Sequence, residues 1–391
     1  MKYVFEGIRV LDFGRFVSAP FAALLMSNMG AEVIKVEKAN GGDDSRYLGP
    51  WCNGVTTYYP SYNYNKKSMA INFRHKEGQK ILLDLVGKSD VIIENFRPGT
   101  INQMGISYEV CQKINPGIII LSISGFGQDG PYKDRAAFND VIESVGMMAY
   151  MLPNGKPVAT HGGPIADVFT GVYGVSAIAA ALYNRNKTGK GQYIDMSMIN
   201  GATAMRSADI AAAECNIEKE REEAPTGVCR AQDNTYFSFW AGDDETFEKL
   251  RKTIRSPVLD NMKFNDMKAR IEDEKEILAE IEKFAASQSA PEVAKLLNSS
   301  GVPSAAVSIE NNGLDLARNE HLNEAGWLVP IEVEGLGVLK HHAFPFRMSA
   351  CPEPVYGPAV KLGYNNDDIL VNLLGRTQTE VETLRETGAI L

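Results

Sequence analysis

Cysteine is sparse in this chain of 391 residues, and its five cysteines are scattered. Their odd number and the absence of a C-x-x-C pair argue against a disulfide framework and a zinc site, and they favour a reducing compartment. Histidine is equally rare, and the adjacent His341 and His342 would point to opposite faces of an extended segment. We therefore expect no metal site.

The amino-acid pattern also predicts no long apolar segment. We expect no run of the roughly 18 apolar residues that a membrane span requires, and no apolar leader with a small-residue cleavage site. The net charge of −9 argues against nucleic acid or an anionic membrane as a partner, because both would be repelled. These absences predict a cytoplasmic protein.

Familiar catalytic and cofactor motifs are missing or incomplete. There is no G-x-S-x-G elbow, and Leu82 stands where a P-loop ending at residues 87–89 would need glycine. Residues 125–130 (GFGQDG) match G-x-G-x-x-G, but the dinucleotide fingerprint needs its third glycine inside an opening helix. Here a polar turn follows, so we expect neither a nicotinamide nor a flavin.

What the chain does contain is an alternation of strand and helix patterns. Apolar strands are predicted at 8–13, 32–37, 69–73, 91–93, 118–122 and 193–196, with helices at 20–29, 77–86 and 167–185 between them. This alternation is typical of an α/β fold with a parallel sheet. A more charged segment, with helices at 245–250 and 267–286, indicates a smaller α/β domain. The predicted division is 1–215, 216–326, and a return to the large domain over 327–391.

Several segments, taken together, resemble the family III CoA-transferases, whose members include formyl-CoA:oxalate and carnitine CoA-transferases and whose relatives include 2-methylacyl-CoA racemases. The matching segments are 7–13 (GIRVLDF), 30–37 (GAEVIKVE), 65–68 (NKKS), 94–99 (ENFRPG), 115–116 (NP), 124–132 (SGFGQDGPY) and 188–192 (TGKGQ). Their order and spacing make the likeness specific in the first half of the chain. It is looser in the second half, at 301–303 (GVP) and 345–349 (PFRMS).

The resemblance implies a nucleophile, Asp167, which follows Gly162, Gly163 and Pro164 and opens a long helix of small residues. Without the resemblance, an aspartate there would be read as a helix cap. With it, the carboxylate attacks the donor thioester to give a mixed anhydride, and the released CoA thiolate converts this to an aspartyl-CoA thioester. The two glycines are candidate backbone donors to the oxyanions.

The resemblance also implies a set of coenzyme A contacts, rich in cations and apolar side chains at strand ends, which suits a ligand with phosphates and an adenine. They are Arg15, Phe16, Val17, Ser18, Lys38, Arg74, Asn95, Phe96, Arg97, Met104, Arg135 and Phe138. Phe138 stands where several transferases have tyrosine, so a hydroxyl contact to the substrate is lost.

Two other functions stay open at this point. A 2-methylacyl-CoA racemase needs an acid/base pair, but no histidine lies between His75 and His161. The other alternative is a catalytically silent CoA-binding protein. The resemblance further implies a Rossmann-like large domain built from both chain ends and an interlocked homodimer acting on an acyl-CoA and a small carboxylic acid. The sequence does not identify the donor and acceptor acids, because the segment near 150–161 that would shape their pocket carries no family motif.

Overall fold

The computed structural model describes residues 2–146, 150–151, 157–158, 163–217, 221–307 and 313–391. These form two compact units, Met1–Ser207 with Asn319–Leu391, and Ala208–Arg318. The first unit thus contains both ends of the chain. The domain bounds 1–215, 216–326 and 327–391 stay a prediction, because compactness alone does not define a domain.

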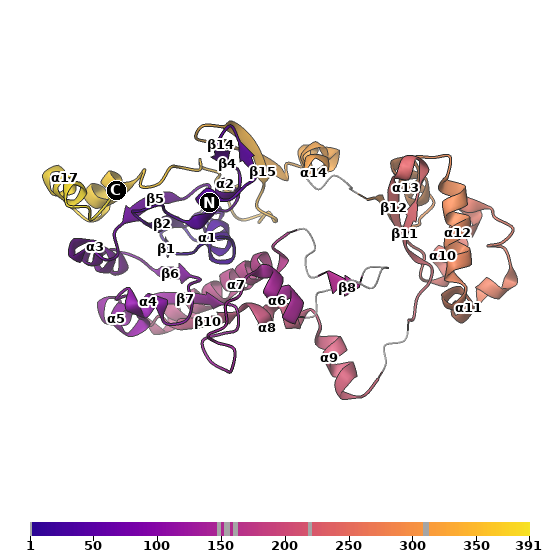
Figure 1. Ribbon diagram of the computed structural model, residues 1–391, viewed down its shortest axis with the longest axis horizontal. Helices are drawn as coiled ribbons and strands as arrows, with labels where there is room; N and C mark the ends of the chain where they lie inside the picture. Colours follow the sequence, from indigo (N-terminus) through magenta and orange to yellow (C-terminus); the bar gives the residue numbers. More distant parts are fainter. Residues whose placement is uncertain (1, 147–149, 152–156, 159–162, 218–220, 308–312) are drawn as a thin grey trace. The chain divides into compact units, whose positions relative to one another are not determined.

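A six-stranded parallel sheet forms the centre of the first unit (Figure 1). Its strands, in chain order, are β1 (Arg9–Asp12), β2 (Glu32–Lys38), β5 (Lys67–Ile71), β6 (Val91–Glu94), β7 (Ile119–Ser124) and β10 (Tyr193–Ser197). They lie in the order β10-β7-β6-β1-β2-β5. The chain builds the sheet outward from β1 in one direction and then from β6 in the other. The carboxyl ends of β1 and β6 therefore form the topological switch point, where open α/β sheets bind ligands.

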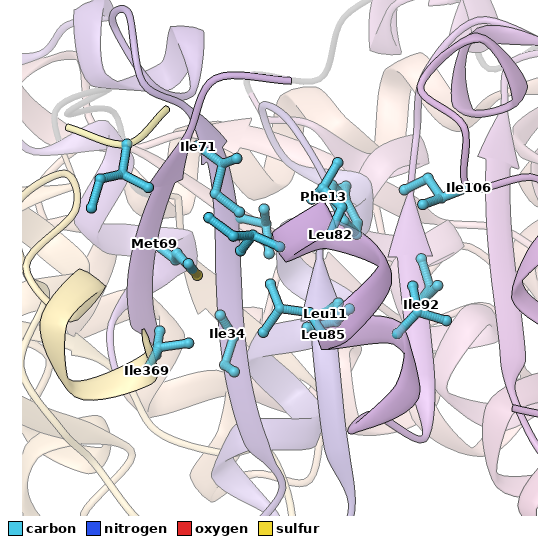
Figure 2. Close-up of a cluster of buried hydrophobic side chains, with 14 of the residues drawn as sticks. Leu11, Phe13, Ile34, Met69, Ile71, Leu82, Leu85, Ile92, Ile106 and Ile369 are labelled. Carbon is cyan, nitrogen blue, oxygen red and sulfur yellow. The ribbon is translucent and has the colours of Figure 1, made fainter. Parts of the chain in front are cut away.

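Apolar side chains cover both faces of this sheet, as expected for a parallel sheet. On one face, Leu82 and Leu85 of α3 (Lys76–Gly87) pack over Leu11, Ile34 and Ile92 of three neighbouring strands (Figure 2). The same core receives the C-terminal segment, with α16 (Asn366–Asp368), a π-helical turn (Ile369–Leu373) and α17 (Gln378–Glu386). Figure 1 shows α17 near β5, the edge strand that Ile390 pairs with through Ile71. This is how the chain's end completes the core begun by its start.

On the other face lie α1 (Ser18–Asn28) and α7 (Ile165–Thr188). By length and composition alone, α7 is apolar enough to cross a membrane, so the expectation that no segment reaches that length is wrong. Its small residues have a packing role here. A Cβ at Gly171 would stand 3.0 Å from Phe21 of α1, and one at Gly174 would stand 2.7 Å from Leu121 of β7. The glycines let α7 approach both elements closely.

The remaining elements of the first unit are short and lie mostly in its connections. They are η1 (Asp44–Tyr47), β3 (Trp51–Cys52), β4 (Val55–Thr56), α2 (Tyr58–Asn63), α4 (Thr100–Gln103), α5 (Tyr108–Ile114), α6 (Asn139–Val145), β8 (Tyr150–Met151), β9 (Pro157–Val158), α8 (Met198–Ala204), α15 (Glu320–Glu324), β14 (Leu328–Val333) and β15 (Gly337–His342). Helix α9 (Ser207–Glu214) begins at the last residue of this unit's first segment.

The second unit is an antiparallel sheet in the order β11-β12-β13, packed against helices around its own apolar core. Its elements are β11 (Thr226–Arg230), η2 (Gln232–Asn234), β12 (Tyr236–Trp240), α10 (Asp244–Ile254), η3 (Met262–Asn265), α11 (Met267–Glu272), α12 (Glu274–Ala285), α13 (Ala290–Ser299), β13 (Ser304–Ala306) and α14 (Leu314–Arg318).

Two sequence predictions of secondary structure need correction. The helix expected over 267–286 is two helices, which meet at Asp273, because Asp273 has left the helical conformation (φ −105°, ψ 21°) and stands at the N-cap position of α12. The strand expected over 69–73 ends at Ile71, after which the side chain of Asn72 accepts a hydrogen bond from the Arg74 N–H and forms a turn.

Candidate active site

A cavity of about 370 Å³ opens at the switch point, between the loops that follow β1 and β6. Its walls combine these two loops with the carboxyl end of β7, the segment before α6, and the start of α7. The lining residues are Arg15, Phe16, Ser18, Asn95, Phe96, Arg97, Pro98, Thr100, Ile123, Ser124, Gly125, Lys133, Arg135, Ala136, Ala137, Phe138, Asp167 and Met198. Most of the residues expected to contact coenzyme A are therefore brought together, from segments far apart in the sequence.

The lining of this cavity, which we call the cationic cavity, includes Arg15, Arg97, Lys133 and Arg135. Four cationic side chains in the lining of one cavity suit a ligand with several phosphates. Lys133 was missed by sequence reasoning, although it lies two residues before Arg135 in the polar turn after the GFGQDG segment. Its closeness to Arg135 in the sequence was the signal that could have identified it.

Asp167 lies in the first turn of α7, where the helix dipole favours a negative charge. The helix has no capping side chain of its own. Instead, Asn139 Oδ1 accepts hydrogen bonds from the backbone N–H groups of Ala166 (3.0 Å) and Asp167 (3.4 Å). A neutral amide from α6 thus pairs with the first backbone N–H groups of α7, so the Asp167 carboxylate is not needed as the helix cap. Sequence reasoning missed this residue, because Asn139 is 28 positions away from Asp167.

Opposing effects set the pKa of the Asp167 carboxyl. Burial raises the pKa of its carboxyl to about 6, hydrogen bonds from the side chain and backbone of Ser18 oppose the rise, and the charges of Glu143 and Asp140 add to it. A carboxylate that is ionised near neutrality yet poorly solvated is a better nucleophile than one in bulk water.

A second cavity, of about 480 Å³, shares Phe16, Phe138 and Asp167 with the cationic cavity. It is lined by Phe16, Val17, Leu48, Tyr58, Phe138, Asn139, Asp140, Gly163, Pro164 and Asp167. We call it the acyl-side cavity. None of its described lining residues is a cation. Burial, aided by the nearby Asp167 charge, raises the pKa of the hydroxyls of Tyr58 and Tyr62, so both stay protonated and able to donate a hydrogen bond.

Phe16 and Phe138 line both cavities and touch each other, edge to face, with ring centroids 5.7 Å apart. The Arg15 guanidinium lies 5.4 Å from the Phe16 ring and also pairs with Asp44. The aromatic pair and Asp167 are therefore shared by the cationic cavity and the acyl-side cavity.

The other expected coenzyme A contacts lie outside the lining of the cationic cavity. Val17 is buried and lines the acyl-side cavity. Lys38 forms an ion pair with Asp44 (3.3 Å), and Met104 packs against the core beneath the sheet. Arg74 lies in the turn after β5. Their roles in binding stay predictions. Gly162 and most of 150–161 lie outside the described residues.

A Rossmann-type strand order with a cationic cavity at its switch point is typical of enzymes that bind phosphate-bearing nucleotides. Comparison with known proteins narrows the class. The model of "CoA-transferase family III" matches residues 5–366. The chain is 32% identical over 399 residues to the succinyl-CoA–L-malate CoA-transferase beta subunit of Chloroflexus aurantiacus, covering 98% of this chain and 97% of that protein. The chain belongs to CoA-transferase family III and is an enzyme that moves CoA between acyl-CoA thioesters and carboxylic acids.

Further relatives agree. Human succinyl-CoA:glutarate CoA-transferase is 32% identical over 397 residues, with 98% of this chain and 89% of that protein covered. Acetyl-CoA:oxalate CoA-transferase of Acetobacter aceti is 34% identical over 312 residues, with 77% and 80% covered. The fold matches the crystal structure of a CAIB/BAIF family protein from Brucella suis with a TM-score of 0.84 and 28% identity, over 95% of this chain and 100% of that one. The family resemblance and the α/β fold expected from the sequence are thus confirmed.

Proposed function

We propose that this enzyme transfers CoA through covalent intermediates on Asp167. The observation that carries the proposal is that Asp167 lines both cavities, so one carboxylate faces a site for coenzyme A and a site for an acid. In a CoA transfer, the nucleophilic carboxylate must be reached both by the thioester of the coenzyme and by the acyl group of the acid. A residue at the junction of two cavities meets this requirement.

The reaction then runs in four displacements. An Asp167 oxygen attacks the donor thioester carbonyl, the C–S bond breaks, and a mixed anhydride and CoA thiolate form. The thiolate attacks the Asp167 carbonyl and expels the donor acid, which leaves an aspartyl-CoA thioester. The acceptor carboxylate attacks this thioester, and the thiolate finally attacks the acceptor carbonyl of the new anhydride, which restores Asp167 and releases the new acyl-CoA.

Charge placement supports this division of roles. The cationic cavity would hold the phosphates of coenzyme A through Arg15, Arg97, Lys133 and Arg135. In the acyl-side cavity, the Tyr58 hydroxyl and the backbone N–H of Gly163 are neutral donors toward developing oxyanions. Neither intermediate would survive free access of water, and apolar side chains that line the acyl-side cavity, among them Phe16 and Val17, would limit that access.

The names of the relatives support a proposal for the substrates. Their names speak of succinyl-CoA or acetyl-CoA as donor and of malate, glutarate or oxalate as acceptor. We propose a short acyl-CoA donor and a small dicarboxylic acid acceptor for this enzyme. The interlocked homodimer and the cytoplasmic location likewise stay predictions. A racemase is disfavoured, because no histidine is among the described residues that line either cavity.

The test is to trap the intermediates. The enzyme is incubated with succinyl-CoA or acetyl-CoA, treated with hydroxylamine, and digested for peptide mass analysis. We expect a hydroxamate on the peptide that contains Asp167, and CoA exchange that Asp167→Asn abolishes. Asp140→Asn, a change to the neighbouring carboxylate of the acyl-side cavity, is the matched control and should keep the adduct. Undiminished exchange in Asp167→Asn would refute the proposal.

A further inference from the structure

The loop of residues 14–18, which follows β1, has a strained backbone at the centre of the candidate site. Phe16 has φ of 61°, a left-handed conformation that is costly for a bulky side chain. Ser18, two residues further on, lines the cationic cavity together with Asp167, and hydrogen bonding from its side chain and backbone opposes the rise in the pKa of that carboxyl. The conformation at Phe16 therefore decides where these two donors point.

Side chains from β1, β2 and the segment after β6 hydrogen-bond to this loop. Asn95 Oδ1 accepts from the Arg15 N–H (2.7 Å), and Asn95 Nδ2 donates to the Arg15 carbonyl (2.8 Å) and to Ser18 Oγ (3.0 Å). The Gly14 N–H donates to Asp12 Oδ1 (2.8 Å), and Lys35 Nζ donates to the Gly14 carbonyl. Three side chains, those of Asp12, Lys35 and Asn95, thus fix successive polar groups of the loop.

Asp43 makes the contact at the strained residue itself. Its Oδ1 accepts from the Phe16 N–H (3.2 Å) and from the Ser45 N–H (2.9 Å), while its Oδ2 lies 3.0 Å from Lys35 Nζ. Asp43 is 3% exposed and Lys35 is fully buried. The carboxylate that holds Phe16 is therefore itself held by a buried cation.

A second buried lysine completes the arrangement. Lys66 Nζ donates to Asp12 Oδ2 (2.7 Å), to Asn63 Oδ1 (2.9 Å), and to the carbonyl of Pro20 in the first turn of α1 (2.8 Å). Lys35 Nζ lies 3.7 Å from the same Asp12 oxygen. We call the four residues Asp12, Lys35, Asp43 and Lys66 the charge cluster. Its charges sum to zero, and each member is at most 4% exposed.

Stability alone does not account for such a cluster. Desolvation offsets most of the attraction between buried ions, so apolar residues of the same volume often stabilise a core equally well. What apolar residues cannot do is bind backbone polar groups. Here the cluster binds the backbone at Gly14, Phe16 and Pro20, all within the loop and the start of α1.

We propose that the charge cluster positions the nucleophile, by holding residue 16 in its left-handed conformation so that Ser18 keeps its hydrogen bonds to Asp167. This inference rests on the proposed function of Asp167. The cluster members do not line either cavity, so they are positioning residues that act through the loop. Asp167 is also faced by Glu143 and Asp140 and by Tyr58 and Tyr62, none of which belongs to the cluster.

The test compares how adduct formation depends on pH. The rate of formation of the hydroxylamine-trapped adduct is measured in wild type and in Asp43→Asn, which keeps the side-chain shape and removes the charge opposite Lys35. Loosened Ser18 bonds favour the protonated carboxyl, so the midpoint of the profile should move upward by about one unit. From a midpoint near 6, this is roughly a fivefold loss of rate at pH 6 that nearly disappears by pH 8. A protein that is merely less folded would lose rate equally at all pH values.

Adjacent lysines provide the matched control. Lys66→Met should move the midpoint in the same direction as Asp43→Asn. Lys67→Met loses ion pairs with Glu32 (3.0 Å) and Asp368 (2.9 Å) but no contact to the loop, and should keep the wild-type midpoint. If Asp43→Asn does not fold, the comparison of the two lysine variants decides. Equal midpoints for Lys66→Met and Lys67→Met would overturn the inference.

A change in the loop itself separates positioning from general stability. In a Phe16→Gly background, residue 16 adopts a positive φ without strain, so Asp43→Asn should move the midpoint less than it does in wild type. An equal movement in both backgrounds would overturn the inference. Failure of the proposed function is a distinct result, because wild type itself would then give no adduct on Asp167.

Discussion

Replacing the candidate nucleophile should make the protein more stable at neutral pH. In the folded protein the pKa of Asp167 is about 6, against an ordinary value of 3.8, with burial as the main cause. The folded state therefore holds this proton more tightly than the unfolded state does. As pH rises from about 4 to about 6, ionisation of Asp167 costs folding free energy, and above pH 6 the full cost is present.

The size of the effect follows from the shift. Two pKa units correspond to roughly 3 kcal/mol, and side-chain relaxation makes this an upper figure. Asp167→Asn keeps the shape and removes the charge, so we expect the melting temperature at pH 8 to rise by about 5 °C. The gain should shrink through pH 6 and vanish near pH 4, where wild type is itself protonated.

Differential scanning calorimetry of both proteins across pH 4–8 measures the difference directly. Glu382→Gln, a change of an exposed carboxylate on α17, is the control and should shift the melting temperature by less than about 1 °C. An Asp167→Asn protein that melts at or below the wild-type temperature at pH 8 would refute the reasoning. So would a gain that does not depend on pH.

Three further outcomes are expected. Arg97→Met should raise the KM for acyl-CoA by roughly 10- to 100-fold with a smaller change in kcat, because it removes a charged contact to phosphate; steady-state kinetics check this, with the exposed Lys88→Met as control. Gly171→Ala should lower the free energy of unfolding in urea by about 1–3 kcal/mol and lower kcat, because the new Cβ would stand 3.0 Å from the Ser18 carbonyl. A substitution without effect would contradict the close packing of α7 on α1. Burial raises the pKa of Glu94 to about 7 against opposing hydrogen bonds from Ser122 and the Phe96 N–H, so Glu94→Gln should raise the melting temperature at pH 8 and leave it unchanged at pH 4; an equal change at both would contradict the shift.

The sequence by itself determined the order of strands and helices and the family. Alternating apolar strands and helices specified a parallel sheet, and the motif segments placed Asp167 at the start of a long helix of small residues, where the structure has it. Such features are local, because they depend on residue spacing and on the conformations that glycine, proline and β-branched residues allow. The same local reasoning overlooked that α7 has the composition of a membrane span.

Tertiary structure alone decided what surrounds Asp167. Lys66 and Lys67 are adjacent in the sequence and equally charged, yet one is buried in the charge cluster and the other pairs near the surface, because successive side chains along an extended chain point to opposite faces. Asn139, Asp43 and Asn95 reach the site from distant segments. No local pattern marks these residues, because their role depends on contacts between parts of the chain that only the folded sheet brings together.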